Sequence, residues 1–166
     1  MPDPGAGDRA QLAELARRWV EEGWSTGGPG APPAGAIVDV LHHPDFIDHD
    51  SGGRAPDNRG FRAGIVALLA AFPDLVAKAC DVVVESTAGG AATCAGASAG
   101  GGASGTVAVR WTAVGTHRGT YLGAGPTGRR ITFKGIEVIR VQGGLVTERW
   151  GEWDGLALLG QLGQWP

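Results

Sequence analysis

The chain has 166 residues, and 43% of them are hydrophobic, which is enough for one domain with a sizeable core. Its formal charge of -3, without a basic run, argues against a nucleic-acid partner and against an acidic membrane surface. No apolar run approaches the roughly 18 residues of a membrane span, and the first residues lack the pattern of a signal peptide. We therefore expect a cytoplasmic protein with a single domain over residues 1–166, of which residues 1–7 form a flexible start.

Helical spacing dominates the first half of the chain. Leu12, Leu15 and Trp19 recur on one face of a helix, and Asp8 with Gln11 fits a capping box at its start. The segments predicted in this half are helices over residues 8–22, 36–41 and 61–72, with a short extended piece over residues 46–49.

Alternating apolar and polar residues dominate the second half. The clearest pattern spans residues 130–153, where two β-rich runs flank a turn at Gln142, Gly143 and Gly144, and this pattern predicts a hairpin. Asp154 then fits the N-cap of a closing helix. The other predicted segments are strands over residues 75–85 and 106–116, a low-complexity loop over residues 86–105, and the closing helix over residues 155–162.

Helices, then an antiparallel meander, then a final helix make an α+β pattern. A curved sheet with helices on one face encloses a pocket. His117 and Arg118 sit beside a loop and are expected to be exposed to solvent.

The pattern of a metal site or of a serine nucleophile is missing. Cys80 and Cys94 are too few for a disulfide framework and lack the spacing of zinc ligands. The possible ligands His42, His43, Asp48 and His49 lack zinc spacing too, and the adjacent histidines point apart. Ser98 matches a nucleophile elbow only because it lies in a tract of alanine, glycine and serine. We expect neither a metal ion nor a serine nucleophile.

A lone carboxylate interrupts an apolar row on the first strand of the hairpin. Ile131, Phe133, Glu137 and Ile139 share one face of that strand, and burying a charge is costly unless the charge is paired or used. Burial would raise the pKa of Glu137 toward neutrality and suit it to general acid or base catalysis. The alternative is a structural ion pair with Arg149, which alternation places on the same face of the neighbouring strand.

The second strand of the hairpin divides into two faces. Alternation puts Thr147, Arg149, Gly151 and Trp153 on one face, and Val146, Glu148, Trp150 and Glu152 on the other. Because Gly151 has no side chain, it would enlarge the pocket or let a ligand approach the backbone.

Asp48 and His49 form a second candidate cluster. On an extended piece they point in opposite directions, so only one of them faces the pocket. His49 could shuttle protons near neutral pH or orient a substrate oxygen. The alternative for both residues is a polar turn or a cap for the loop that follows.

Aromatic side chains are numerous for so few strands. Core packing is the default for each of them, yet together they suit a pocket for a large apolar substrate. The residues expected to bind such a substrate are Phe46, Trp111, Tyr121, Phe133, Arg149, Gly151 and Trp153.

Six short segments occur in the order seen in SnoaL-like polyketide cyclases, which belong to the nuclear-transport-factor-2-like superfamily. They are residues 43–49, 71–74, 114–119, 125–129, 136–140 and 161–163. The resemblance covers residues 12–163. It implies a cone-shaped barrel, in which a curved and mostly antiparallel sheet is wrapped by N-terminal helices around an apolar cavity. It also implies a homodimer and an enzyme without cofactor or metal.

The resemblance further implies ring closure in polyketide natural-product biosynthesis, including antibiotic biosynthesis, by acid/base catalysis. The acid/base aspartate of characterised cyclases falls at Gly151, and their cavity histidine falls at Glu137, so both positions depart from the family pattern. We therefore expect a cyclase in which Glu137 moves a proton, His49 or Asp48 assists, and Arg149 tunes the carboxylate or holds a carbonyl. The alternatives are a non-catalytic small-molecule-binding domain and an epoxide-opening hydrolase on the same scaffold.

Overall fold

The computed structural model describes residues 5–87 and 102–164. Residues 1–4 of the predicted flexible start, Cys94, Ser98 and most of the predicted loop over residues 86–105 lie outside these ranges. The helices are α1 (Ala6–Glu21), α2 (Ile37–Leu41), α3 (Asn58–Ala71) and α4 (Gly155–Leu162). Among the described residues, no helix is long and apolar enough to cross a membrane.

The strands form one five-stranded sheet in the order β1-β5-β4-β3-β2. Their bounds are β1 (His42–Asp48), β2 (Val76–Ser86), β3 (Gly105–Thr116), β4 (Arg130–Gln142) and β5 (Leu145–Trp153). β1 and β5 run parallel, whereas the other neighbours are antiparallel. The predicted α+β fold with a curved, mostly antiparallel sheet is confirmed. The predicted barrel is wrong in one respect, because β1 and β2 remain separate edges and the sheet stays open.

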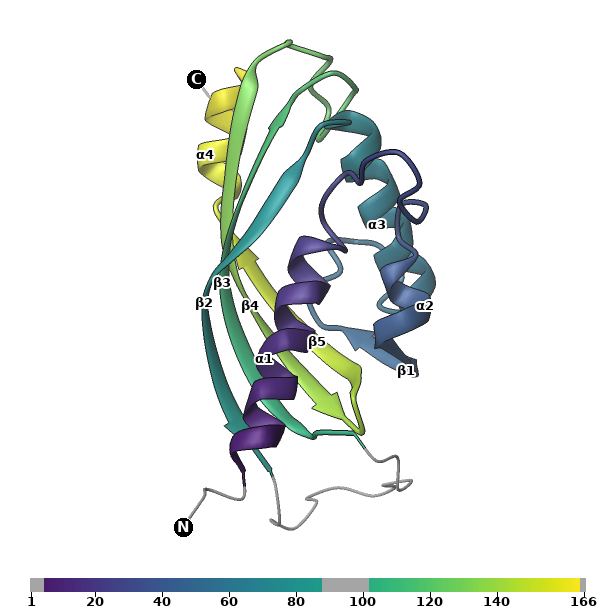
Figure 1. Cartoon of the computed structure of the whole chain (residues 1–166). Coiled ribbons are helices and arrows are strands. Elements are labelled where there is room, and N and C mark those ends of the chain that lie inside the picture. The colour runs from purple at the N-terminus through teal and green to yellow at the C-terminus, as the bar shows by residue number, and fades with distance from the viewer. Residues whose placement is uncertain (1–4, 88–101, 165–166) are drawn as a thin grey trace.

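The helices cover the two faces of the sheet unequally. Figure 1 shows α1, α2 and α3 against the concave face, with α4 packed on the opposite face beside β4. α1 buries an apolar stripe that includes Leu12 and Trp19, as predicted. It begins at Ala6, however, so Asp8 lies in the first turn and the predicted capping box is absent. α3 begins one turn earlier than predicted, because the Asp57 carboxylate accepts a hydrogen bond from the Gly60 amide at 2.8 Å.

A buried histidine ties the concave helices to the first strand. Trp19 Nε1 donates to His42 Nε2 at 2.8 Å, so His42 Nδ1 carries the proton that it donates to Asn58 Oδ1 at 2.9 Å. Burial lowers the pKa of His42 from 6.5 to about 4, despite the hydrogen bond to Asn58. Because His42 begins β1, this contact fixes the strand that carries Asp48.

The β4–β5 hairpin has the predicted turn but one unpredicted irregularity. Gly143 and Gly144 have φ values of 56° and 83°, the left-handed pair that a two-residue hairpin turn favours. The register then slips, since Arg140 pairs with Glu148 whereas Val141 pairs with Val146. Thr147 is thus the extra residue of a β-bulge, which turns Val146 inward beside Arg149. The predicted assignment of Val146 to the outer face is therefore wrong.

At the other end of the sheet lie α4, on the outer face of β4, and the β3–β4 loop (Figure 1). The predicted cap of α4 is confirmed, because the Asp154 carboxylate accepts from the Ala157 amide at 3.0 Å. The predicted exposure of His117 is wrong, since its side chain is buried and stacks on Phe72 at 5.2 Å between centroids. The loop folds back over His117, and the Gly128 amide donates to the His117 carbonyl at 2.9 Å. This fold-back buries the imidazole.

Candidate active site

A cavity of about 190 Å³ lies between the concave face of β3, β4 and β5 and the helix α3. Its wall is mostly aromatic and aliphatic, which suits an apolar ligand. Of the predicted substrate-binding residues, Trp111, Tyr121, Phe133, Arg149 and Trp153 line it. Phe46 does not, because it is buried behind the wall and packs on the His42 ring at 4.1 Å between centroids.

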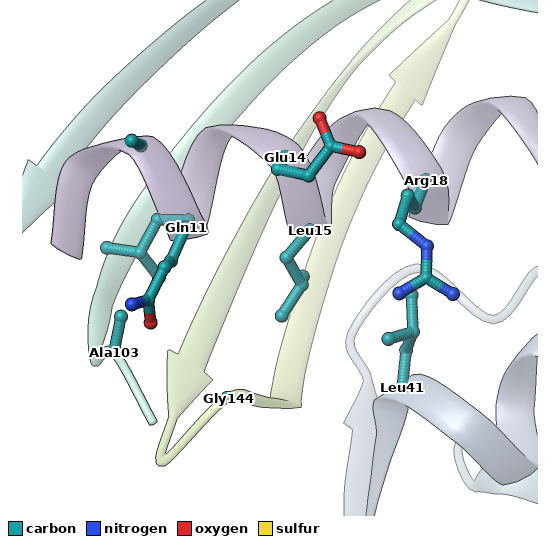
Figure 2. Close-up of a pocket in the computed structure, with 9 residues that line it drawn as sticks. Gln11, Glu14, Leu15, Arg18, Leu41, Ala103 and Gly144 are labelled. Atoms are coloured by element: carbon teal, nitrogen blue, oxygen red, sulfur yellow. The ribbon is translucent and has the colours of Figure 1, made fainter. Parts of the chain in front are cut away.

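A larger hollow of about 430 Å³ lies elsewhere, along α1. Figure 2 shows Gln11 and Leu15 extending from α1 toward Ala103 and Gly144, whereas Glu14 extends away from them. Arg18 on its wall forms a solvent-exposed ion pair with Glu22 at 2.9 Å. We place the candidate active site in the smaller cavity, because buried charged groups that could do chemistry lie only there among the hollows described.

The charged part of the cavity wall is a buried ion-pair network. Arg149 binds Glu137 through two bonds, from Nε to Oε2 at 2.6 Å and from Nη2 to Oε1 at 3.2 Å. Trp111 Nε1 also donates to Glu137 Oε1 at 3.2 Å. Arg149 Nη1 donates to Asp48 Oδ1 at 2.7 Å. Glu137 and Asp48 are each 1% exposed and Arg149 is 5% exposed, so this network is screened from water.

Glu137 therefore fits both predicted roles, a buried carboxyl group in the cavity and a structural ion pair with Arg149. Its carboxylate lines the cavity, and it is also the partner of Arg149. Burial raises the pKa of Glu137, and the charge of Asp48 adds to this effect, whereas Arg149 and Trp111 oppose it. Burial disfavours the charge on Arg149, but its bonds to Glu137 and Asp48 outweigh burial and raise its pKa. The network thus combines a permanent cation with a carboxyl group that has become a stronger base.

Gly151 lies directly opposite Glu137 in the β4–β5 ladder. A Cβ atom at position 151 would overlap Arg149 Nη2 and Glu137 Oε2. The expectation that the missing side chain enlarges the cavity is therefore wrong, because the ion pair fills that space. The Gly151 amide donates to Asp50 Oδ2 at 2.8 Å, which ties β5 to the loop after β1. Glycine at this position is what allows the guanidinium to lie beside the strand.

Asp48 and His49 point to opposite sides of the sheet, as alternation predicted. Asp48 faces inward to Arg149, whereas His49 stacks on Trp150 at 4.4 Å between centroids and contacts Glu148 Oε2 at 2.9 Å. His49 is exposed on the face that carries Trp150, away from the cavity. The structure thus brings Asp48 together with Glu137 and leaves His49 apart from both.

Among the residues on the cavity wall that sequence reasoning missed are Trp24, Asp50 and Arg54. Two glycines with positive φ, Gly52 and Gly53, turn the loop after β1 back, so that Arg54 Nη2 reaches Asp48 Oδ2 at 3.4 Å. Gly52 and Gly53 indicate a turn, but the sequence alone does not show where the side chain of Arg54 points after it.

Tyr121 supplies an uncommitted polar group. It lines the cavity, and its hydroxyl has no hydrogen-bond partner among the described residues. Burial raises the pKa of this phenol, and the charge of Arg54 partly opposes the rise. A neutral phenol is free to donate a hydrogen bond to a ligand.

The described part of the chain contains no cluster of side chains arranged as metal ligands. Within residues 5–87 and 102–164, no group of three or more histidine, cysteine, aspartate or glutamate side chains is placed to hold a metal ion.

The family model of the SnoaL-like polyketide cyclases matches residues 101–162, which include β3, β4, β5 and α4. The predicted resemblance to SnoaL-like polyketide cyclases is confirmed. A comparison with curated proteins found no match.

Solved structures match the fold over nearly the whole chain. TsrD from Streptomyces laurentii is 24% identical, with a TM-score of 0.68 over 99% of this chain and 100% of that chain. AclR, a candidate hydroxylase from Streptomyces galilaeus, is 23% identical, with a TM-score of 0.66 over 97% of this chain and 87% of that chain. IdmH, a candidate polyketide cyclase from Streptomyces antibioticus, is 25% identical, with a TM-score of 0.59 over 97% of this chain and 99% of that chain. These likenesses establish the SnoaL-like fold.

Proposed function

We propose that the protein is a cofactor-independent cyclase that closes a ring in a polyketide-type intermediate. The observation that carries this proposal is a carboxyl group with a raised pKa, Glu137, on the wall of an apolar cavity in a SnoaL-like scaffold. A carboxyl group in this setting accepts and returns a proton near neutral pH more readily than an exposed one. The proposal extends the family resemblance to a specific residue of this chain.

The roles follow from what each group can donate or accept. Glu137 takes a proton from the carbon or hydroxyl that becomes the nucleophile. Arg149 polarises the carbonyl that is attacked, since its guanidinium lines the same cavity and stays charged. The Tyr121 hydroxyl orients a substrate oxygen. His49 takes no part, because it lies on the opposite face of the sheet.

The aromatic wall supplies the rest of the rate acceleration. Trp111, Phe133 and Trp153 restrict a flexible chain to a folded conformer in which its reacting atoms approach each other. Such restriction converts a slow intramolecular encounter into a fast one. Dehydration with oxygen attack, epoxide opening and pericyclic closure all remain routes that this cavity could promote.

A product analysis tests the proposal. Purified protein is incubated with linear polyketide-type chains that carry either a hydroxyl and an unsaturated carbonyl or an epoxide, and the products are separated by mass spectrometry. The proposal expects a ring-closed product that contains no oxygen from labelled water. A diol that carries the labelled oxygen would instead identify the epoxide-opening hydrolase.

One observation favours a second candidate, a binding domain without chemistry. Both oxygens of Glu137 already accept hydrogen bonds, from Arg149 and Trp111, so the carboxylate is committed before a ligand arrives. A binding domain predicts tight ligand capture with no conversion of any chain tested. Conversion by the wild-type protein would reject it.

We also propose a cytoplasmic homodimer that associates through the outer face of the sheet. Exposed apolar side chains on β2 and β4 support this, since Val83 is 69% exposed and Ile136 is 52% exposed. Light scattering on the purified protein gives the molar mass. A monomer at micromolar concentration would contradict the dimer.

A further inference from the structure

We infer that Asp48 is a positioning residue, which shares the Arg149 guanidinium with Glu137 and so leaves the Glu137 carboxyl only partly neutralised. The inference rests on the proposed function, because it assigns how the proton-moving group of that site is tuned. It also reassigns Asp48, which the sequence suggested as a catalytic group that assists Glu137.

Asp48 can act only through other residues. Its side chain is fully buried and is not part of the cavity wall. Oδ1 accepts from Arg149 Nη1 at 2.7 Å and from the Asp50 amide at 3.1 Å, and Oδ2 accepts from Arg54 Nη2 at 3.4 Å. Every strong bond of this carboxylate therefore leads to an arginine or to the backbone.

The guanidinium of Arg149 is divided between two strands. Nε and Nη2 face Glu137 on β4, whereas Nη1 faces Asp48 on β1 and the Asp50 carbonyl at 3.4 Å. A cation shared by two carboxylates neutralises each of them less than it would neutralise one alone. The two carboxylates also repel each other, and the charge of Asp48 accordingly favours the protonated form of Glu137.

The other charged and titratable groups near Glu137 come from two loops. Asp50 and Arg54 line the cavity from the loop after β1, and Tyr121 lines it from the loop after β3. Arg54 is bound to Asp48 and its side chain is 39% exposed, so its charge is partly screened by water. Asp48 and Arg149 are thus the fully buried charges that set the state of Glu137.

Titration of Glu137 tests the inference without any substrate. The protein is labelled with ¹³C at the glutamate carboxyl groups, and the Glu137 signal is identified by its loss in Glu137→Gln. Asp48→Asn keeps the size of the side chain and removes its charge. We expect the titration midpoint of Glu137 to move to lower pH in Asp48→Asn, because Arg149 then serves Glu137 alone. A midpoint that stays in place or moves to higher pH would overturn the inference.

A second variant decides the matter if Asp48→Asn fails to fold. Arg54→Gln removes, from a partly exposed position, the cation that competes with Arg149 for Asp48. Asp48 then interacts more strongly with Arg149. The Glu137 midpoint should then move to higher pH, and an unchanged or lower midpoint would overturn the inference.

Asp39→Asn is the matched control, since it removes a carboxylate from an exposed ion pair with Arg62 away from the cavity, and it should leave the midpoint unchanged. A purely structural role for Asp48 would lower stability and leave the midpoint in place. If the protein is not a cyclase, it shows no turnover, whereas the titration of Glu137 and its response to Asp48→Asn stay the same.

Discussion

Glu137 and Gly151 face each other across the β4–β5 ladder, and the space that a side chain at position 151 would fill holds the guanidinium of Arg149. Both positions differ from the pattern that the family resemblance implies. The differences are physically linked, because the ion pair of Glu137 with Arg149 requires a residue without Cβ between them. A reaction centre that depends on an aspartate at position 151 cannot form beside this arginine.

Gly151→Ala should break the ion pair. The added methyl group overlaps Arg149 Nη2 and Glu137 Oε2, so at least one charge loses its partner while still buried. Breaking a buried pair costs about 3–5 kcal/mol, and we expect a loss of this size in the free energy of unfolding. Urea denaturation measures it. Gly160→Ala is the control, since open space surrounds that helical glycine and the change should stabilise slightly.

Arg149→Met should destabilise the protein more at pH 7 than at pH 5. At pH 7 the variant must bury the Asp48 and Glu137 charges without their shared cation, at a cost of about 3–5 kcal/mol. At pH 5 the Glu137 carboxyl, whose pKa is raised by burial, takes up a proton more readily in the folded variant, so the difference from wild type shrinks. Arg140→Met removes a partly exposed pair with Glu148 and should cost about 1 kcal/mol or less. A deficit that is independent of pH would contradict this account of the network.

His42 should make stability depend on pH below neutrality. Its folded pKa of about 4 lies below the ordinary value of 6.5, so the unfolded chain binds a proton more tightly. Stability is therefore complete above pH 6.5 and falls as the pH drops toward 4, by at most about 3 kcal/mol from this residue. Imidazole NMR signals check the cause directly. A His42 signal that titrates near pH 6.5 would show that burial does not keep the imidazole neutral.

His49→Ala should leave turnover and ligand affinity unchanged. Its imidazole stacks on Trp150 on the outer face of the sheet and contacts Glu148, so it does not reach the cavity. The loss of this exposed contact should cost about 1 kcal/mol or less in the free energy of unfolding. A large loss of turnover would return His49 to the reaction and contradict the placement of the site.

Much of the fold was predictable because it depends on local patterns. The hairpin turn at Gly143 and Gly144, the cap at Asp154 and the inward face that carries Glu137 all follow from backbone preference and alternation. The bulge at Thr147 was not predictable in this way, since one extra residue reverses the alternation of a strand without any fixed sequence signal. Local sequence patterns also did not show that the edges of the sheet stay open.

The candidate site was predictable only in part. Glu137 and Arg149 emerged as a pair because alternation placed both on one face, whereas alternation left open which of Asp48 and His49 faces inward. The missing information was three-dimensional: whether the vacant space beside Gly151 is open or filled. Side-chain packing decides that, and residues distant in sequence determine the packing, as the contact of Asp48 with Arg149 shows.

The central claim is that the Glu137 carboxyl moves a proton in this cavity. Turnover and ligand affinity of Glu137→Gln, measured in parallel, test it most directly. Tryptophan fluorescence reports affinity, because Trp24, Trp111 and Trp153 line the cavity, and Glu148→Gln on the outer face of the same hairpin is the control. The account predicts that Glu137→Gln loses turnover by about 100-fold or more while affinity is largely kept. Turnover equal to that of wild type would contradict it and would leave the aromatic cavity alone to account for ring closure.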